Sequence, residues 1–414
     1  MQPINQKLYR PFWTPDDSSQ ECFNCKTAFT TILRRHHCRS CGNIYCSNCT
    51  RYKQSLPQLH YNEPVRVCQR CDSLATYLKL SQSKVVLDRI EASKGFCKVT
   101  LDVESKKLII KCYLSSLHRL LTAYEFNRTI FKHLSRAIAN LSDNEIYKID
   151  IIEANLLDPL LDFLIDVYKD PTHYTNTNML VQSPTMECIS GSVNSITSNS
   201  TTSSQSSYSG DGSSTNSLNG STDLDDTESL LNVCICLEHL AVIEHQIIKN
   251  QLGERCLPRL IELSKLSFSS QIKHSISIVL LNLTKNSQTR DYIMKNNGIQ
   301  AFLMNSLGDD IQESSSEAIS ILSTNSKNHR KIVESGALPP LILMLNSMND
   351  KVLQYTTFAL SNLSINPENQ ITIAQVGGIN PLRNIITDKN NMNNHILFNT
   401  ATTIFNLSTN SLYT

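Results

Sequence analysis

Eight cysteines in one short stretch constrain the fold of this chain more than any other feature. They form four Cys-x-x-Cys pairs, at Cys22, Cys25, Cys38, Cys41, Cys46, Cys49, Cys68 and Cys71. Four such pairs supply the ligands of two tetrahedral sites. A site closed by four thiolates leaves no position for a catalytic water. We therefore expect two structural Zn²⁺ ions.

The four pairs can share two metals in more than one way. The gap between Cys41 and Cys46 is short, which favours an interleaved arrangement. The first zinc would then be bound by Cys22, Cys25, Cys46 and Cys49. The second would be bound by Cys38, Cys41, Cys68 and Cys71.

The alternative for these cysteines is four free or disulfide-bonded pairs. A disulfide scaffold is typical of secreted proteins, which carry a signal peptide. Residues 1–10 contain no apolar core of that kind, and no run of the sequence approaches the ~18 apolar residues of a membrane span. We therefore expect a cytoplasmic, reducing compartment, in which paired cysteines bind metal.

A basic stretch surrounds the second cysteine pair. It reads Arg34-Arg35-His36-His37-Cys38-Arg39-Ser40-Cys41-Gly42. Residues 1–80 hold 11 Lys and Arg against 5 Asp and Glu, although the whole chain has a net charge of +1. The bulk charge therefore does not predict nucleic-acid binding. Cations fixed on a metal corner can instead converge on one anion, and we interpret this anion as the phosphate of a membrane lipid.

With two further motifs, the segment at residues 8–75 resembles a FYVE zinc finger. The motifs are Trp13-Thr14-Pro15-Asp16, the basic stretch, and Arg66-Val67-Cys68. The resemblance implies two small β-hairpins and a C-terminal helix that starts near Asp72. It also implies recognition of phosphatidylinositol 3-phosphate on endosomal membranes.

The resemblance further implies roles for single side chains. The 3-phosphate would be bound by Arg35, His37, Arg39 and Arg66. Arg34 would face the phosphodiester, and Asp16 and His36 would hydrogen-bond the free 4- and 5-hydroxyls. A carboxylate at that place also repels lipids that are phosphorylated there.

The loop before the basic stretch would insert into the bilayer interface through Thr31, Ile32 and Leu33. For Leu33, packing inside the finger is an equal alternative. Burying one or two such side chains contributes only a few kcal/mol, about 1.5–3 for each, so the anchor is modest. We therefore expect an oligomer or a second partner to add avidity.

Residues 76–126 form a connector that is partly helical. The apolar residues between Leu74 and Glu91 are consistent with a helix, whereas Val99, Leu101 and Val103 alternate. The alternation leaves a hairpin and a capping helix both open.

Residues 127–410 repeat a helical unit. The aligned positions are Leu141, Leu240, Leu283, Leu322, Leu363 and Leu407, and the last four intervals are 43, 39, 41 and 44 residues. A period of ~40–47 with three helical segments is typical of armadillo and HEAT repeats. The segments at 336–339 and 362–364 resemble armadillo repeats in particular. The sequence thus predicts a finger followed by an all-α armadillo-like superhelix.

The first interval is longer, at 99 residues, because of an insertion at residues 170–226. In residues 189–222, 23 of 34 residues are Ser, Thr or Asn. A segment of this composition buries too little apolar surface to fold, so we expect disorder.

Stacked repeats form an elongated groove that is suited to a protein partner. The residue before each aligned leucine forms an asparagine column: Asn140, His239, Asn282, Ile321, Asn362 and Asn406. We take Asn282, Asn362 and Asn406 as candidates for binding a peptide. Maintenance of the fold is an equal alternative for these side chains.

The predicted function is a non-enzymatic adaptor that is peripheral on endosomal membranes. The finger would bind phosphatidylinositol 3-phosphate, and the repeats would bind an unidentified protein. We do not expect nucleic acid to bind, and no catalytic motif is present. The alternative is a RING-like E3 ubiquitin ligase with substrate-binding repeats, because RING domains also interleave two zinc ions, although their sites normally include a histidine.

Overall fold

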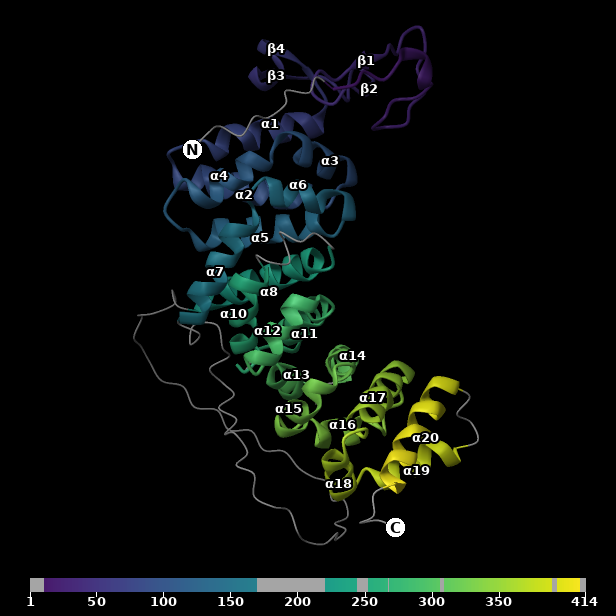
Figure 1. The fold of residues 1–414 in the computed structure, drawn as a ribbon. Helices are drawn as coiled ribbons and strands as arrows, with labels where there is room; N and C mark the ends of the chain where they lie inside the picture. The colour runs from purple at the N-terminus through teal and green to yellow at the C-terminus, as the bar shows by residue number, and fades with distance from the viewer. Residues whose placement is uncertain are drawn as a thin grey trace, which may run out of the picture.

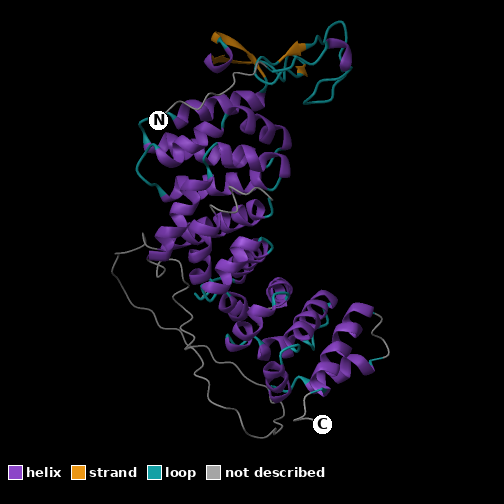
Figure 2. Ribbon diagram, in the orientation of Figure 1, coloured by secondary structure: helices purple, strands orange, loops and turns teal. Residues whose placement is uncertain are grey.

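Two small antiparallel hairpins form the N-terminal finger (Figures 1 and 2). The structure is a computed structural model that describes residues 11–169, 220–243, 252–266, 268–305, 309–388 and 393–409. In the first hairpin, β1 (His36–His37) pairs with β2 (Ile44–Tyr45), which places His36 opposite Tyr45. A short 3₁₀ turn, η1 (Asp16–Ser18), precedes it.

The second hairpin pairs β3 (Tyr52–Leu56) with β4 (Tyr61–Val67) around the 3₁₀ turn η2 (Pro57–Leu59). His60 closes this turn in the left-handed conformation, with φ of 63°. Val67 and Leu56 are buried at the two ends of the ladder. The finger thus has the predicted pair of hairpins, and it has little apolar core beyond them.

Helix α1 (Gln69–Ser81) belongs to both the finger and the helical region. It begins directly after Cys68, and its residues Cys71 and Ala75, one turn apart, are buried in the finger core. Leu74 is buried instead in the core of the helical region. A continuous helix with two buried faces therefore joins the finger to the repeats.

The connector consists of helices α2 (Val86–Val99), α3 (Val103–Cys112) and α4 (Leu114–Thr122). Of the two alternatives for the alternating residues, the hairpin does not form. Leu101 lies exposed in the turn between α2 and α3, and the Asp102 side chain caps α3 by accepting from Ser105 N at 2.9 Å.

The remaining helices follow an all-α armadillo-like pattern of three helical segments per unit, with a long third helix. Helices α3 and α4 with α5 (Arg128–Ser142) form a leading unit. The later third helices are α8 (Gly220–Ala241), α11 (Ser270–Thr284), α14 (Asp309–Ser323), α17 (Asp350–Leu363) and α20 (Asn394–Ser408). The shorter segments between them are η3 (Glu145–Tyr147), α6 (Lys148–Glu153), α7 (Leu157–Lys169), the π-helical turn η5 (Leu252–Cys256), α10 (Leu257–Leu263), α12 (Ser287–Lys295), α13 (Ile299–Asn305), η6 (Ser326–Asn328), α15 (His329–Glu334), α16 (Leu338–Met344), α18 (Pro367–Gln375) and α19 (Ile379–Thr387).

The third helices stack in chain order. Helices α2, α5, α8, α11, α14, α17 and α20 each pack against the next, and the stack curves (Figure 1). Asparagine side chains cap many helices of the repeats by accepting from backbone N–H groups of the first turn. These caps are Asn127, Asn144, Asn286, Asn325, Asn349, Asn366 and Asn393.

Most of the predicted insertion, residues 170–219, lies outside the described residues. Helix α7 precedes it, and α8 already begins at Gly220, so the last seven residues of the predicted segment are helical. The insertion therefore separates the second and third helices of one unit.

Glycine serves two different purposes at two adjacent positions before the second helix of a unit. Gly336 turns the chain with φ of 82°, and Gly377 does the same at 86°. Gly298 and Gly378 instead allow close packing, because a Cβ on Gly378 would lie 2.9 Å from Ile342 Cδ1.

Candidate metal centres and anion pocket

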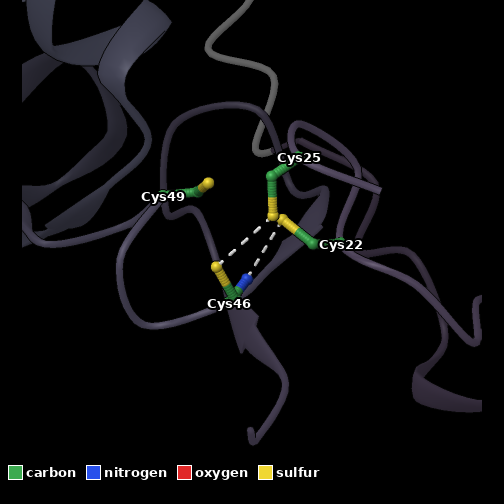
Figure 3. A group of neighbouring side chains, drawn as sticks. All are labelled: Cys22, Cys25, Cys46 and Cys49. Atoms are coloured by element: carbon green, nitrogen blue, oxygen red, sulfur yellow. Dashed lines mark hydrogen bonds between the residues drawn. The ribbon is translucent and has the colours of Figure 1, made fainter. Parts of the chain in front are cut away.

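Two groups of four cysteines lie in the finger. The sulfur atoms of each group all lie within 4.8 Å of one another. One group, drawn in Figure 3, is Cys22, Cys25, Cys46 and Cys49. The other is Cys38, Cys41, Cys68 and Cys71. The structure thus brings together the two interleaved sets, and all eight cysteines are free of disulfide bonds.

The spacing of the sulfur atoms fits zinc. A tetrahedral site with Zn–S bonds of about 2.3 Å requires neighbouring sulfurs about 3.8 Å apart. Cys25 Sγ and Cys46 Sγ are separated by 3.8 Å. Each group offers four thiols and no open position, so two closed structural zinc sites match this donor set.

Backbone N–H groups support the ligands. Cys46 N donates to Cys22 Sγ at 3.3 Å, and Cys68 N donates to Cys38 Sγ at 3.2 Å. Such bonds orient a ligating thiolate and stabilise its charge. They also join the two chain segments that contribute to each site, and three of the four cysteines directly follow a strand of a hairpin.

Gly42 closes the corner that starts at Cys38 and holds the Trp13 segment against it. Its φ is +78°, and its N–H donates to Cys38 O at 2.9 Å. A Cβ at this position would lie 2.2 Å from Phe12 O. The missing side chain lets the Phe12 segment approach, and Thr14 N then donates to Gly42 O at 3.1 Å.

His37 and Arg39 are ordered by this docked segment. The rings of Trp13 and His37 stack with centroids 4.6 Å apart, and His37 Nε2 donates to Thr14 O at 2.7 Å. The Arg39 guanidinium lies 5.2 Å from the Trp13 ring centroid and donates to His37 O at 2.8 Å. Asp16 approaches the same His37 nitrogen at 3.9 Å.

Four predicted head-group residues form one positive cluster. Arg39 N donates to Arg66 O at 3.0 Å, which brings the turn after β1 beside strand β4. Partial burial, and then the charges of Arg66, Arg39 and Arg34, lower the pKa of His36. His36 is therefore favoured in its neutral form, with three arginines close enough to act on its charge.

Arg35 is placed differently. Its Nε donates to Ser19 O at 3.2 Å, its Nη2 donates to Gln20 Oε1 at 3.0 Å, and its guanidinium packs over the Phe29 ring. In this structure Arg35 therefore holds the loop before the basic stretch. Its predicted contact with a phosphate stays a prediction.

The loop ahead of the basic stretch is a tight turn that presents Ile32. Thr30 N donates to Leu33 O at 3.1 Å, and Thr30 Oγ1 accepts from the backbone N–H of both Ile32 and Leu33. Ile32 is 93% exposed, and Thr31 is also exposed. Leu33 packs partly against the finger core, which favours the packing alternative for that residue.

Two side chains of the asparagine column form hydrogen bonds with the preceding repeat. Asn362 Nδ2 donates to Ser323 Oγ at 3.0 Å, and Asn406 Nδ2 donates to Ser364 Oγ at 3.0 Å. Each acceptor lies on the preceding third helix or at its C-cap. Asn282 makes no such bond, since Ala241 stands at the corresponding hydroxyl position.

Three contributors were not among the predicted site residues. Trp13 orders His37 and Arg39, Phe29 supports Arg35, and Gly42 admits the Phe12 segment. The sequence carried a signal for two of them, because Trp13 and Gly42 stand within the recognised motifs. Phe29 had no such signal.

Comparison with known families agrees with both parts of the chain. A model described as "FYVE zinc finger" matches residues 12–76, and a model described as "Armadillo/beta-catenin-like repeat" matches residues 325–365. The first family implies phosphoinositide binding, and the second implies interaction with proteins.

Known proteins resemble this chain over short segments. Over 59 residues it is 48% identical to "Lateral signaling target protein 2 homolog" of Brugia malayi and 44% identical to "Phosphatidylinositol-3,5-bisphosphate 3-phosphatase MTMR4" of Mus musculus. Over 87 residues it is 37% identical to "Arrestin domain-containing protein A" of Dictyostelium discoideum. These matches cover 14%, 14% and 20% of this chain, and 10%, 5% and 15% of the three relatives.

A solved structure has a similar fold over most of the chain. It is described as "A conserved phosphorylation switch controls the interaction between cadherin and beta-catenin in vitro and in vivo". The TM-score is 0.60 at 15% identity, and the likeness covers 83% of this chain and 54% of that chain. Within the described residues, no helix is long and apolar enough to cross a membrane. The chain therefore joins a FYVE zinc finger with two zinc sites to armadillo-type helical repeats.

Proposed function

We propose that this chain is a non-enzymatic adaptor that docks on endosomal membranes. Its finger binds phosphatidylinositol 3-phosphate, and its repeats bind a protein partner. The observation that carries this proposal is the cluster of Arg34, His36, Arg39 and Arg66 around strands β1 and β4, beside the two groups of cysteines.

The arrangement suits a phosphate bound by two arginines at once. Arg39 and Arg66 are neighbours through a backbone hydrogen bond, and Arg39 is already oriented by His37 O and the Trp13 ring. Guanidinium groups bind phosphate oxygens through charge-assisted hydrogen bonds. A side chain that is ordered in advance loses less rotamer entropy on binding.

His36 suits a hydroxyl better than a second charge. The three arginines and partial burial lower its pKa, so the neutral imidazole is favoured. A neutral ring offers one donor and one acceptor, which matches a free inositol hydroxyl. Asp16 is exposed near His37 and remains our candidate for the other hydroxyl.

The Ile32 turn supplies the contact with the bilayer. The Ile32 side chain is almost fully exposed to solvent and lies only two residues before Arg34. Transfer of such a side chain into the interface contributes about 1.5–3 kcal/mol. A lipid head group and this side chain can thus be engaged together.

Liposome co-sedimentation of the full chain tests the proposal. The full chain is required because α1 contributes to both cores, so that truncation after it would expose Leu74. We expect preference for phosphatidylinositol 3-phosphate over the 4- and 5-phosphates and the bisphosphates. Arg39→Ala should abolish that preference, whereas Arg330→Ala, a surface arginine of the repeats, should not change it. Equal binding to every phosphoinositide would contradict the proposal.

Ile32→Ala separates membrane insertion from head-group recognition. We expect it to weaken binding to liposomes while leaving the affinity for soluble inositol 1,3-bisphosphate unchanged. An equal loss in both assays would show that Ile32 acts on the pocket rather than on the bilayer.

The rival function, a RING-like ubiquitin ligase, has a separate test. Neither His36 nor His37 belongs to the metal groups, which consist of eight cysteines. We expect no ubiquitin chains when the protein is incubated with E1, a panel of E2 enzymes and ubiquitin. Chain formation that depends on Cys38 would contradict the adaptor role.

A further inference from the structure

The two groups of cysteines differ in their exposure to solvent. In the group drawn in Figure 3, Cys25 is exposed and Cys49 is partly exposed. In the other group only Cys41 is partly exposed, and the remaining three are buried. We call the first set the outer group (Cys22, Cys25, Cys46 and Cys49) and the second set the inner group (Cys38, Cys41, Cys68 and Cys71). A reagent in solution therefore reaches the outer group more easily.

The inner group lies where the finger meets the helical region. Cys71 belongs to α1, and Cys41 lines a cleft together with Arg70 of α1 and Leu108 of α3. Leu108 also packs against the finger core. Both cysteine pairs of the outer group lie instead in turns of the finger, before β1 and after β2. The helices thus protect one group and leave the other open.

The outer group holds the loop that presents Ile32. Cys22 N donates to Thr27 O at 2.8 Å, and Phe29 N donates to Gln20 O at 2.8 Å. These bonds tie the loop that leaves the first cysteine pair back to the segment that enters it. The Ile32 turn follows directly after this ladder, so its position depends on the two turns that the outer group joins.

The inner group holds the anion pocket. Arg39 directly follows Cys38, and Arg66 stands two residues before Cys68. Cys68 N donates to Cys38 Sγ at 3.2 Å, and Arg39 N donates to Arg66 O at 3.0 Å. The two metal centres therefore support different contacts: the outer group supports the exposed turn, and the inner group supports the arginines.

We propose that the outer group is a redox-sensitive support of the Ile32 loop and that Cys25 is its site of oxidation. The oxidant is a hydroperoxide. Oxidation opens the outer group, releases its zinc ion and disorders the loop, while the arginines stay in place. The effect on membrane binding rests on the proposed function, whereas the oxidation itself does not.

The chemistry needs only the peroxide and two thiolates. A cysteine that binds metal is a thiolate, and its oxidation depends on exposure. Cys25 Sγ attacks one peroxide oxygen, so that an S–O bond forms, the O–O bond breaks and hydroxide leaves. A second thiolate of the group then attacks this sulfur and displaces the second hydroxide; Cys46 Sγ is 3.8 Å away. Two sulfurs lose two electrons to the peroxide, and the resulting disulfide leaves too few ligands for a closed site.

Polar neighbours of the outer group moderate this reaction. Thr27 Oγ1 lies 3.2 Å from Cys25 Sγ, and Asn24 Nδ2 donates to Cys49 Sγ at 3.5 Å. A hydroxyl that donates to a ligating thiolate stabilises its charge and makes it a weaker nucleophile. Thr27 is therefore a positioning residue that sets how fast Cys25 reacts.

Titration of the full chain with hydrogen peroxide tests the site of oxidation. A colorimetric assay should find that one of the two zinc ions is released first, and peptide mapping should find Cys25 in a disulfide within the outer group. The inner group should stay reduced. Thr27→Val should release that zinc ion faster than the wild type. Ser47→Ala, in the other turn of the same group and also exposed, should release it at the wild-type rate.

Two binding assays on the oxidised protein test the consequence. Binding to liposomes that contain phosphatidylinositol 3-phosphate should fall more than binding to soluble inositol 1,3-bisphosphate, and dithiothreitol with Zn²⁺ should restore it. The proposal is overturned by simultaneous release of both zinc ions, by earlier oxidation of the inner group, by an unchanged rate in Thr27→Val, or by equal losses in the two binding assays. Failure of the untreated protein to bind either probe would contradict the proposed function, and the zinc assay would still decide whether Cys25 is the site of oxidation.

Discussion

In the finger, five of the ten buried core residues are cysteines, whereas the helical repeats bury columns of leucine and isoleucine along the whole stack. A segment as short as the finger cannot bury enough apolar surface to stabilise its fold alone. Metal–thiolate bonds supply what the core lacks. The repeats instead gain stability from each neighbouring unit, as in other stacked arrays. Removal of metal should therefore unfold the finger, whereas truncation of a core side chain in the repeats should destabilise the repeats.

Removal of zinc is expected to have the largest effect, and on the finger alone. A structural zinc site contributes about 10–16 kcal/mol to the folding of a small domain. Treatment with a strong chelator should abolish lipid binding while most of the far-ultraviolet helical signal remains. Cooperative loss of that signal during metal removal would mean that the repeats depend on the metal sites.

Truncation of a core leucine should have the opposite pattern. Leu360 is fully buried in α17, so Leu360→Ala should lower the stability of the repeats by about 2–5 kcal/mol. Thermal unfolding followed by helical circular dichroism measures this loss, and a colorimetric zinc assay should still find two zinc ions. Ile365→Ala, at a 63% exposed position, is the control and should change little. Loss of zinc in Leu360→Ala would contradict the separation of the two regions.

A pair of glycine variants sharpens the comparison at the level of the backbone. Gly42 and Gly336 both have positive φ, but only Gly42 has another backbone atom where its Cβ would stand. Both Ala variants should lose about 1–2 kcal/mol from the left-handed conformation. Only Gly42→Ala should displace the Trp13 segment and weaken lipid binding, with zinc content unchanged. Equal lipid binding by both variants would argue against that role of Gly42.

Two asparagines of the column give the smallest expected difference. Asn362→Ala removes the bond to Ser323 and should cost about 0.5–1.5 kcal/mol. Asn282→Ala should stay within about 0.5 kcal/mol of the wild type, as is usual for residues without a specific contact. Denaturant unfolding measures both. A large loss for Asn282→Ala would show that our account of the column is wrong.

The sequence predicted the two kinds of region because each leaves a regular signal. Cysteine pairs specify a metal site by spacing, and the leucine alignment specifies stacked helices by period. The connector lacked both signals. Its alternating residues Val99, Leu101 and Val103 belong to the end of one helix, a turn and the start of the next, which no local period describes.

Contacts between distant residues could not be predicted in this way. The bond from Asn406 to Ser364 depends on which hydroxyl the preceding repeat offers, and the break at Asn282 depends on Ala241. The same holds for Arg35, whose side chain contacts Phe29 and Gln20 rather than the other residues of the basic stretch. The glycines of the repeats likewise have two roles that only the structure distinguishes, a turn at Gly336 and close packing at Gly378.

Helix α1 gives the molecule a mechanical property. Cys71 and Ala75 are buried in the finger core, and Leu74 is buried in the core of the repeats. Helix α1 therefore fixes the finger relative to the repeats. The salt bridge from Arg70 to Asp102, at 2.8 Å, braces the same joint from the side. If the finger docks on a bilayer as we propose, the stack of helices extends from the membrane in one fixed direction. A protein partner bound along the stack would then be held at a fixed distance from the membrane and in a fixed orientation. A force on that partner would be transmitted to the membrane through α1.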